Sequence, residues 1–183
     1  MSTVLGEGKF LRLKRDGRWE FVERVNARGA VAIVAITADR QFILTDQFRP
    51  AVGRHVIDLP AGLTGDVAGE EDEEFSSSAM RELVEETGYQ ATTMEHVADY
   101  TSSPGLCSEV ISLFVAHELR QIDKGGGVDG EEITVHTPSL RGIERWLATQ
   151  VAAGKLIDGK VYAGLYFAKR RPKRANSNSV TKR

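Results

Sequence analysis

The sequence contains one cysteine among its 183 residues. Cys107 therefore has no partner within the chain for a disulfide, and one thiolate is too few for a zinc site built of cysteines. No stretch approaches the roughly 18 to 20 uninterrupted apolar residues that cross a bilayer. The first residues also lack the apolar run of a secretory signal. We therefore expect a cytoplasmic protein of one domain, without disulfides and without a membrane partner.

Positive charge is scarce outside the C-terminal end. Seven of the 24 Lys and Arg residues lie at or after Lys169, where none of the 26 acidic residues is found, so residues 1–168 carry a net charge of −9. An acidic body suits divalent cations better than an extended nucleic-acid backbone. The basic tail could add salt-sensitive affinity for RNA, but it has no interleaved aromatic residue. We expect a solvated tail and no nucleic-acid partner.

Strand-like patterning fills the first half of the chain and returns in its middle. Residues 10–25 form two β-prone runs around Asp16-Gly17, a pair favoured in type I′ turns, and predict a β-hairpin. Residues 29–38 are nearly all apolar, as in a strand that is buried on both faces. The other segments with the composition of strands are 41–48, which should pair with 29–38, and 54–60, 94–101, 109–118 and 131–137.

Helices are predicted at 76–87, 139–153 and 159–169, where apolar residues recur at helical spacing. Gly88 follows the first of them in the position favoured for a C-terminal cap. The main loops are 62–74, rich in Gly and acidic residues, and 125–130, rich in Gly and expected to be mobile. This order of strands and helices is typical of an α+β fold with helices on a mixed sheet.

The helix at 76–87 separates an apolar stripe from an acidic face. The stripe consists of Met80, Leu83, Val84 and Thr87. Glu82, Glu85 and Glu86 cluster on the opposite side, and Arg81 is placed four residues before Glu85 to hold it by an ion pair. A solvated acidic face is the simpler interpretation, but such faces usually interleave lysines and this one has none. Three carboxylates with so little compensation indicate a hard cation such as Mg²⁺ or Mn²⁺.

Residues 81–89, RELVEETGY, resemble the second half of the Nudix box, the pattern G-x5-E-x7-R-E-U-x-E-E-x-G-U in which U is a bulky apolar residue. The first half departs from the pattern, because Val67 stands where the box glycine is expected. Gly62 is the glycine that fits the context, which implies about five extra residues in the following loop. The early acid of the box is then either Glu73 or Glu70.

Three further stretches resemble the ADP-ribose pyrophosphatases and related nucleoside diphosphate sugar hydrolases of that family. They are QFRPAVGRHVIDLPAG at 47–62, TSSPGLCSEVISLFVA at 101–116 and EEITVHTPS at 131–139. Asp58 stands where Glu is usual. The resemblance covers the chain from about Trp19 to Phe167. It implies a Nudix-type α/β/α sandwich with a mixed sheet, preceded by an N-terminal antiparallel β-hairpin.

The same resemblance divides the chain into three parts. Residues 1–28 are expected to form the N-terminal hairpin and to serve as a dimerisation element, because a homodimer is typical of these relatives. Residues 29–170 correspond to the Nudix hydrolase domain. Residues 171–183 form the basic tail, which has almost nothing to bury and is expected to be disordered.

The resemblance also implies roles for particular residues. Glu82 and Glu86 would be the main ligands of Mg²⁺, with Mn²⁺ as a substitute. Glu85 would bridge or assist, the carbonyl of Ala61 would complete the shell, and Arg81 would orient Glu85. The general base would lie on the late loop, where Glu131 is narrowly preferred to Glu132, with Asp129 behind them.

Four residues are candidates for substrate binding. Arg49 could pair with phosphate oxygens, for which a planar guanidinium is well suited. Trp19 and Phe21 could stack on a nucleobase, in a pocket often completed across a dimer, although alternate residues on a strand are more often core. Glu109 matches a family acid near the substrate or the metal. His55 and His136 lack partners at ligand spacing and are interpreted as structural.

The implied activity is Mg²⁺-dependent hydrolysis of the pyrophosphate bond of ADP-ribose and other nucleoside diphosphate sugars, such as GDP-mannose. The products would be a nucleoside monophosphate and a sugar phosphate. One alternative is a hydrolase of nucleoside triphosphates or dinucleoside polyphosphates. Another is a non-catalytic ADP-ribose sensor, which should have lost box carboxylates that this sequence retains.

Overall fold

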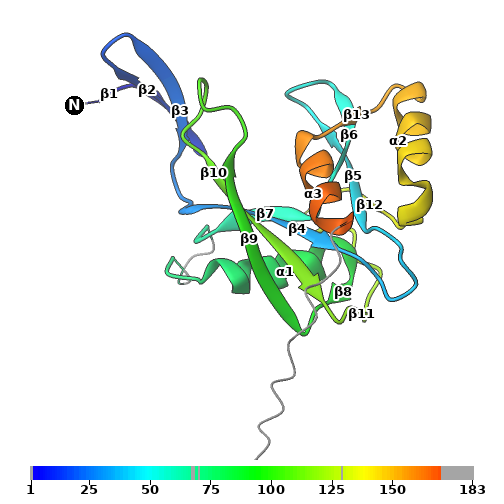
Figure 1. Cartoon of the computed structure of the whole chain (residues 1–183). Coiled ribbons are helices and arrows are strands. Elements are labelled where there is room, and N and C mark those ends of the chain that lie inside the picture. Colours follow the sequence, from blue (N-terminus) through cyan, green and yellow to red (C-terminus); the bar gives the residue numbers. More distant parts are fainter. Residues whose placement is uncertain (1, 67–68, 70, 129, 170–183) are drawn as a thin grey trace, which may run out of the picture.

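The centre of the molecule is a four-stranded mixed sheet. The computed structural model describes residues 2–66, 69, 71–128 and 130–169 (Figure 1). In the sheet β4 (Gly29–Ala35) and β10 (Val110–His117) run parallel, and β7 (Ala61–Thr64) and β9 (Thr93–Thr101) flank them in antiparallel register. Every residue of β4 after Gly29 is buried, as expected for an apolar strand that is covered on both faces.

A second sheet contains β12 (Ile133–His136), β5 (Leu44–Arg49), β6 (Arg54–Asp58) and β13 (Leu156–Ile157), in that order. The predicted pairing of 41–48 with 29–38 is therefore wrong beyond a single bridge between Ile36 and Phe42. The reason is that β10 and β7 already occupy both hydrogen-bonding edges of β4. Strand β5, which contains most of the segment 41–48, pairs with β6 and β12 instead.

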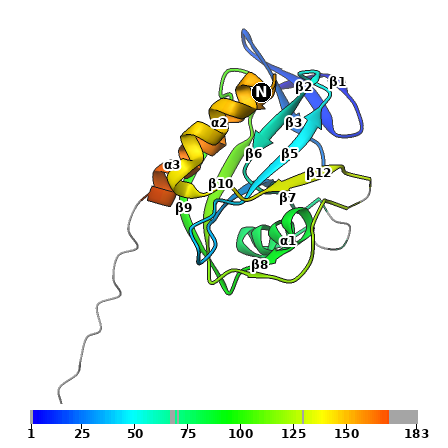
Figure 2. The same ribbon diagram turned by 90° about the vertical axis from the view of Figure 1, so that its right-hand side faces the viewer.

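Helices cover both faces of the central sheet, which confirms the expected α/β/α sandwich. Figure 2 shows α1 (Phe75–Thr87) on one side and α2 (Ile143–Ala152) and α3 (Gly159–Lys169) on the other. Leu83 of α1 belongs to the core beneath one face, and Leu165 of α3 to the core above the other. The remaining short elements are β8 (Tyr89–Gln90), β11 (Arg120–Gln121) and the 3-10 helix Leu140–Gly142.

The N-terminal segment is a three-stranded antiparallel sheet that projects from the body (Figure 1). The predicted hairpin is present as β2 (Leu11–Asp16) and β3 (Trp19–Arg24), and β1 (Thr3–Glu7) adds a third strand. All of β1 is exposed, so its sequence lacks the alternation of apolar and polar residues from which a strand is predicted. The turn is also displaced: Asp16 pairs with Trp19, and the loop is Gly17-Arg18, with a positive φ at Gly17 but not at Arg18. A glycine at the first loop position is typical of type II′ rather than type I′.

Helix α1 begins and ends where the sequence predicts, and Gly88 has the left-handed φ of 72° of a C-terminal cap. The predicted stripe is wrong in part. Met80 is exposed, whereas Glu86 is buried together with Leu83 and Thr87. The helix lies against β7, so its acidic side faces protein rather than solvent. The predicted loop at 62–74 likewise begins later, after the residues of β7.

The two predicted C-terminal helices are present. Within the part of the chain that the structure describes, no helix is both long and apolar enough to span a bilayer. The expectations for Val67, Glu70, Asp129 and the tail at 171–183 concern positions outside the described residues.

Candidate active site

A polar cavity of about 320 Å³ lies beside α1, where strands of both sheets and the start of α3 approach each other. Its acidic side chains are Asp58, Asp66, Glu82, Glu86, Glu109 and Glu131, and its cationic side chains are Arg24, Arg49 and Lys160. Six of the eleven site residues predicted from the sequence line it, namely Arg49, Ala61, Glu82, Glu86, Glu109 and Glu131. Residues far apart in the chain thus converge on one charged pocket.

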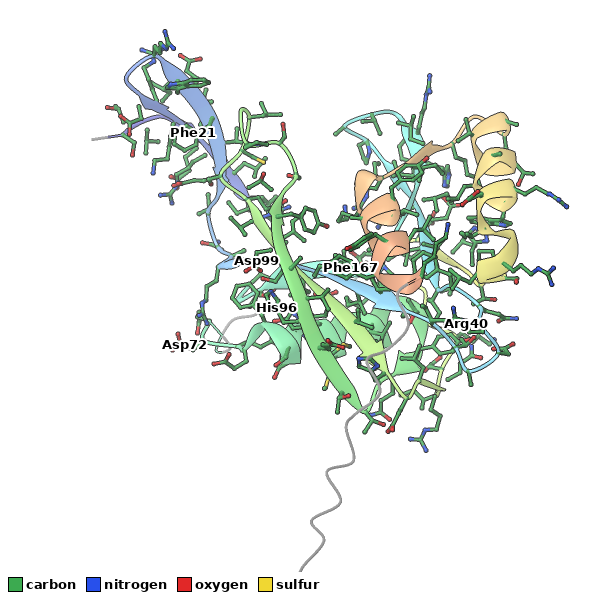
Figure 3. All side chains as sticks on the ribbon, viewed as in Figure 1. Phe21, Arg40, Asp72, His96, Asp99 and Phe167 are labelled. Carbon is green, nitrogen blue, oxygen red and sulfur yellow. The ribbon has the colours of Figure 1, made fainter. Side chains whose placement is uncertain are left out.

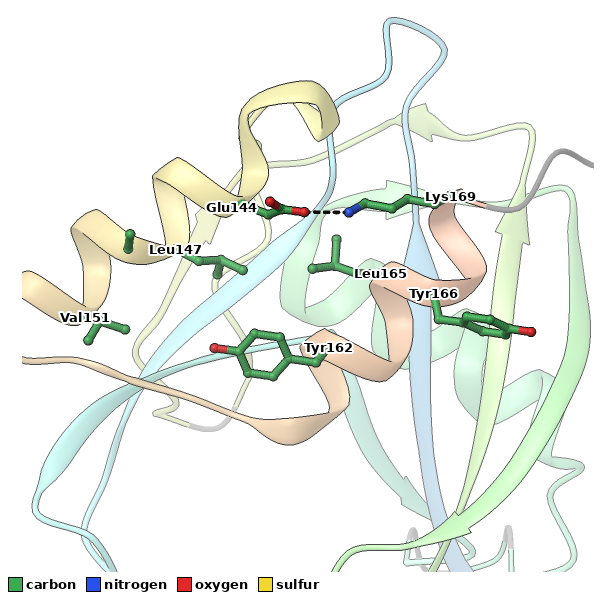
Figure 4. A pocket seen from close by; sticks show the side chains of 8 residues that line it. Glu144, Leu147, Val151, Tyr162, Leu165, Tyr166 and Lys169 are labelled. Atoms are coloured by element: carbon green, nitrogen blue, oxygen red, sulfur yellow. Dashed lines mark hydrogen bonds and ion pairs between the residues drawn. The ribbon is translucent and has the colours of Figure 1, made fainter.

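A larger hollow of about 650 Å³ lies between α2 and α3 (Figure 4). Its walls are mainly apolar, with Leu147 and Leu165 among them, and Glu144 and Lys169 form an ion pair of 2.7 Å at one end. These two charges neutralise each other. The hollow therefore offers less to a charged substrate than the smaller polar cavity does, and we take the polar cavity as the candidate active site.

Gly62 lies directly against the acidic face of α1. A Cβ atom at this position would be 1.9 Å from Cδ of Glu82, so no side chain fits there. The close approach brings β7 and the carboxylate of Glu82 to the same wall of the cavity. It also gives a physical reason for a glycine at position 62, where the sequence pattern favoured one.

The guanidinium of Arg81 is hydrogen-bonded to three carboxylates. Nη1 lies 2.8 Å from Glu82 and 3.1 Å from Glu85, and Nη2 lies 3.3 Å from Glu73. Nη2 also donates a hydrogen bond to the carbonyl of Leu63 at 3.2 Å. The expected ion pair between Arg81 and Glu85 is therefore present, and Glu73 is the early-box candidate that the structure places against Arg81.

Glu82 and Glu86 have little compensation for their burial in the cavity. Burial raises the pKa of Glu82 to about 7, although Arg81 acts in the opposite direction. Burial also raises the pKa of Glu86 well above its ordinary value, and the charges of Glu82 and Glu131 add to the effect. The backbone N–H of Ala61 donates to Glu86 at 3.0 Å and opposes the rise. A cation in the cavity would relieve the desolvation and the repulsion of both carboxylates.

The donor set fits a hard divalent cation. Among the described residues, no three His, Cys, Asp or Glu side chains form a ready metal cage. Mg²⁺ rarely needs one, because it usually takes one or two carboxylates and completes its shell with water and substrate phosphates. Glu82 and Glu86, one turn apart on α1, supply such a pair. Glu85 is turned towards Arg81, and Ala61 contacts Glu86 through its N–H.

The two candidate general bases differ in position. Glu131 lines the cavity, and its charge contributes to the raised pKa of Glu86. Glu132, which is exposed like Glu131, does not line the cavity. Only the first of these acids is therefore placed where substrate would bind.

The substrate-binding candidates also fall into two groups. Arg49 and Glu109 line the cavity, and Glu109 accepts a hydrogen bond from Nε of Arg24. Trp19 and Phe21 lie on the projecting N-terminal sheet, and neither lines the cavity within one chain (Figure 3). Trp19 is 60% exposed.

Lys160 is a cavity residue that the sequence reasoning missed. Its Nζ lies 2.9 Å from Asp58 and 2.9 Å from Asp158. Although burial opposes the change, these two aspartates raise the pKa of Lys160 and keep it charged. A lysine in the first turn of a helix is disfavoured by the helix dipole. That conflict is the signal that could have drawn attention to it.

His55 and His136, which the sequence analysis interprets as structural, both contact the buried Asp46. Nδ1 of His55 lies 2.9 Å and Nε2 of His136 3.3 Å from the carboxylate, and Nζ of Lys155 lies 2.6 Å from it. Asp46 does not line the cavity, whereas its neighbour Gln47 does. Because successive residues of a strand point to opposite faces, the histidine cluster lies behind the cavity wall.

Comparison with known proteins assigns the chain to a family. Residues 26–164 match the family model described as the NUDIX domain. The chain belongs to the Nudix family of hydrolases. Nudix hydrolases generally need a divalent metal ion. The matched Nudix segment includes the residues of α1 and both sheets, and most of the cavity.

Three curated relatives of this Nudix chain are informative. It is 36% identical to a methanol dehydrogenase activator of Bacillus methanolicus, over 68% of this chain and 68% of that protein. It is 36% identical to an ADP-ribose pyrophosphatase of Bacillus subtilis, over 64% of this chain and 60% of that one. It is 32% identical to a GDP-mannose pyrophosphatase of Cronobacter sakazakii, over 70% and 65% of the two chains. The match thus spans less than two thirds of the length of the last two relatives.

A solved structure supports the Nudix fold. The crystal structure of an ADP compounds hydrolase superposes with a TM-score of 0.63 at 18% sequence identity, covering 81% of this chain and 80% of that one. At this low sequence identity, the structural similarity shows that the two proteins share a fold.

Proposed function

We propose that this Nudix protein hydrolyses the pyrophosphate bond of ADP-ribose and of related nucleoside diphosphate sugars such as GDP-mannose. The products are a nucleoside monophosphate and a sugar phosphate. The names of two curated relatives support this substrate class. The activity depends on Mg²⁺, for which Mn²⁺ can substitute.

The observation that carries the proposal is the charge arrangement of the cavity. Glu82 and Glu86 are buried with too little positive charge around them, whereas Arg49 and Arg24 lie in the same cavity. Such a pocket can accept a cation together with the anionic pyrophosphate that the cation accompanies. Neither ligand alone would satisfy both groups of charges.

Each residue has a distinct task in this proposal. The guanidinium of Arg49 binds phosphate oxygens and orients the pyrophosphate. Glu131 accepts a proton from the attacking water as the new P–O bond forms and the bridging P–O bond breaks. Arg81 is a positioning residue, because it holds Glu82 and Glu85 at the angles they have in the structure.

The metal ion would be held mainly by Glu82 and Glu86, with Glu85 assisting and the carbonyl of Ala61 as a further ligand. When bound, it supplies positive charge that stabilises the phosphate oxygens as the leaving phosphate develops charge. Burial of the two glutamates makes the metal-free site costly to ionise, so the cation and the ionised carboxylates stabilise each other.

A homodimer formed through residues 1–28 is part of the proposal. The projecting sheet leaves Leu11 and Trp19 exposed within one chain. A second copy would cover them and bring Trp19 or Phe21 to the nucleobase in the cavity of its partner. Light scattering of the full chain tests the assembly, since a monomeric mass would contradict it. We retain a cytoplasmic location as a prediction.

The activity is tested by phosphate release in two stages. The protein is incubated with ADP-ribose, GDP-mannose, ADP-glucose or UDP-glucose, with Mg²⁺ or with a chelator. The reaction is quenched, and alkaline phosphatase is added afterwards, so that the metal requirement of the phosphatase does not interfere. We expect Mg²⁺-dependent turnover of ADP-ribose or of a nucleotide sugar.

The matched control is Glu144→Gln, which changes a glutamate on α2 that lies outside the cavity. It should retain full activity. Preferred turnover of GTP or diadenosine polyphosphate, read by chromatography, would contradict the proposed substrate class. If no compound is hydrolysed but ADP-ribose binds in calorimetry, the protein is a sensor instead of an enzyme.

A further inference from the structure

The helix that carries the metal-binding glutamates ends against the glycine-rich segment 125–128. The last carbonyl groups of an α-helix have no partner within the helix. Here the N–H of Gly126 donates to the carbonyl of Glu86 at 2.9 Å, and the N–H of Gly127 donates to the carbonyl of Glu85 at 3.1 Å. The segment that was expected to be a mobile loop is thus hydrogen-bonded to the end of α1.

The two backbones approach too closely for side chains to lie between them. A Cβ atom on Gly125 would be 2.3 Å from the carbonyl carbon of Thr87. A Cβ atom on Gly88 would be 2.2 Å from the carbonyl oxygen of Asp123. Both glycines have positive φ angles, 66° and 72°. The start of the loop is therefore fixed on the helix end, backbone against backbone.

Gly127 connects this junction to Glu131. A Cβ atom on Gly127 would be 2.6 Å from Cβ of Glu131 and 2.8 Å from its Oε2. The N–H of Glu131 donates to the carbonyl of Val128, the residue after Gly127, at 3.0 Å. The side chain of Glu131 thus lies against the bare face of a glycine whose own N–H is bound to the backbone of Glu85.

We propose that Gly127 is a positioning residue that sets the carboxylate of Glu131 in register with the metal-binding helix. The contacts run from the Glu85 backbone through Gly127 to the Glu131 side chain, which lines the cavity. Any side chain on residue 127 must push Glu131 aside. This inference rests on the proposed function, because it requires Glu131 to act as the base.

The chain offers a matched pair of glycines for the test. Gly127 and Gly130 have nearly the same φ, 86° and 87°, so an alanine is strained equally in both places. Among the described residues other than its neighbours in the chain, none has an atom within 4 Å of a Cβ on Gly130. Gly127→Ala should lower kcat about 100-fold, the loss expected for a catalytic group displaced by about 1 Å. Gly130→Ala should change kcat much less.

Two further readouts separate positioning from general damage. The affinity for Mn²⁺, measured by calorimetry, should be the same in Gly127→Ala and the wild type, because Glu82 and Glu86 are not displaced. The KM for ADP-ribose should also stay close to the wild-type value in Gly127→Ala, because Arg49 is not displaced, so that the loss falls on kcat. Equal losses of kcat in the two glycine variants would overturn the proposal.

A double-mutant cycle identifies the partner of Gly127. On a Glu131→Gln background, Gly127→Ala should cause no further loss of kcat, because both changes remove the same function. A full additional loss would overturn the positioning role and leave the proposed function intact. A Glu131→Gln variant with wild-type kcat would instead overturn the assignment of the base, and the positioning role with it.

A variant that leaves the loop unstrained guards against misfolding of Gly127→Ala. Glu131→Asp withdraws the carboxylate from Gly127 by one methylene group. It should lower kcat about 100-fold at unchanged Mn²⁺ affinity. Its control is Glu132→Asp, at the neighbouring acid outside the cavity, which should retain activity. Full activity of Glu131→Asp would contradict the need for this placement.

Discussion

Asp46 and Glu86 are buried to nearly the same extent, with 5% and 6% of their surfaces exposed, yet their surroundings move their pKa values in opposite directions. Burial acts to raise the pKa of Asp46, but hydrogen bonds from Lys155, His55 and His136 outweigh it and lower the value. For Glu86 burial prevails and raises the pKa. The described residues give it one hydrogen-bond donor, the N–H of Ala61.

The difference distinguishes a structural carboxylate from a functional one. Three donors surround Asp46, so its charge is satisfied without a ligand. Glu86 and its neighbour Glu82 share a cavity whose positive charge is insufficient for both. Burial alone therefore does not mark an active site. The shortage of compensating charge does so, because such carboxylates must bind either a proton or an external cation.

Glu86→Gln should show the largest effect on function. Loss of a metal ligand should lower kcat about 1,000-fold, since a bound metal ion contributes several kcal/mol of transition-state stabilisation. The metal-free protein should be as stable as the wild type or more so, because an uncompensated charge is removed. Kinetics with ADP-ribose and urea denaturation measure the two effects. A Glu86→Gln variant that unfolds more easily and remains active would contradict the difference drawn between Glu86 and Asp46.

Asp46→Asn should show the reverse pattern. It removes the charge that Lys155, His55 and His136 share, and the free energy of unfolding should fall by about 1–3 kcal/mol. The kcat for ADP-ribose should change by less than about threefold, because Asp46 lies behind the cavity wall. Urea denaturation at pH 7 measures the stability. Unchanged stability, or a loss of activity comparable to that of Glu86→Gln, would show that the two carboxylates are not different in kind.

The pH dependence of stability should show the smallest effect. Because the pKa of Glu82 is raised from 4.5 to about 7, the folded metal-free protein binds more protons than the unfolded chain between these values. Its free energy of unfolding should therefore fall as the pH rises through this window. The full shift corresponds to about 3 kcal/mol. Because Glu82 is only partly buried, solvent screening reduces the expected fall to about 1 kcal/mol, or about 2–4 °C in Tm. The lowered pKa of Asp46 has the opposite sign, with stability lost only on acidification below about 3.8.

Thermal unfolding of the metal-free protein between pH 4.5 and 7.5 measures this dependence of stability on pH. Addition of Mg²⁺ should restore the lost stability at the high end of the range, where both glutamates are ionised and bind the ion. The control is Glu82→Gln, in which the decline should be reduced. A Tm that rises steadily across the window in the metal-free wild type would contradict the raised pKa.

The sequence predicts those parts of the site that depend on local spacing. Helix α1, its cap at Gly88 and the spacing of Glu82, Glu85 and Glu86 all follow from one short window, in which helical periodicity decides which side chains are neighbours. The contact between Arg81 and Glu85 follows from the same geometry. Gly62 could be selected because its neighbours match a known pattern.

The features of the fold and of the site that the sequence does not predict depend on contacts between segments far apart in the chain. The face of α1 that becomes buried is decided by its packing on β7, so Met80 was assigned to the wrong side. Lys160 reaches the cavity only because α3 begins beside Asp58, about 100 residues earlier in the chain. The pairing of β5 depends on which strands already occupy the edges of β4. Local patterns carry no information about such competition.

The central claim is that the poorly compensated carboxylates, and not the satisfied one, make this chain a metal-dependent hydrolase. Release of AMP from ADP-ribose in the presence of Mg²⁺, measured by chromatography in the wild type, Glu86→Gln and Asp46→Asn, tests it most directly. The account predicts turnover by the wild type and by Asp46→Asn, and none above background by Glu86→Gln. Turnover by Glu86→Gln at the wild-type rate, or loss of turnover in Asp46→Asn alone, would contradict it.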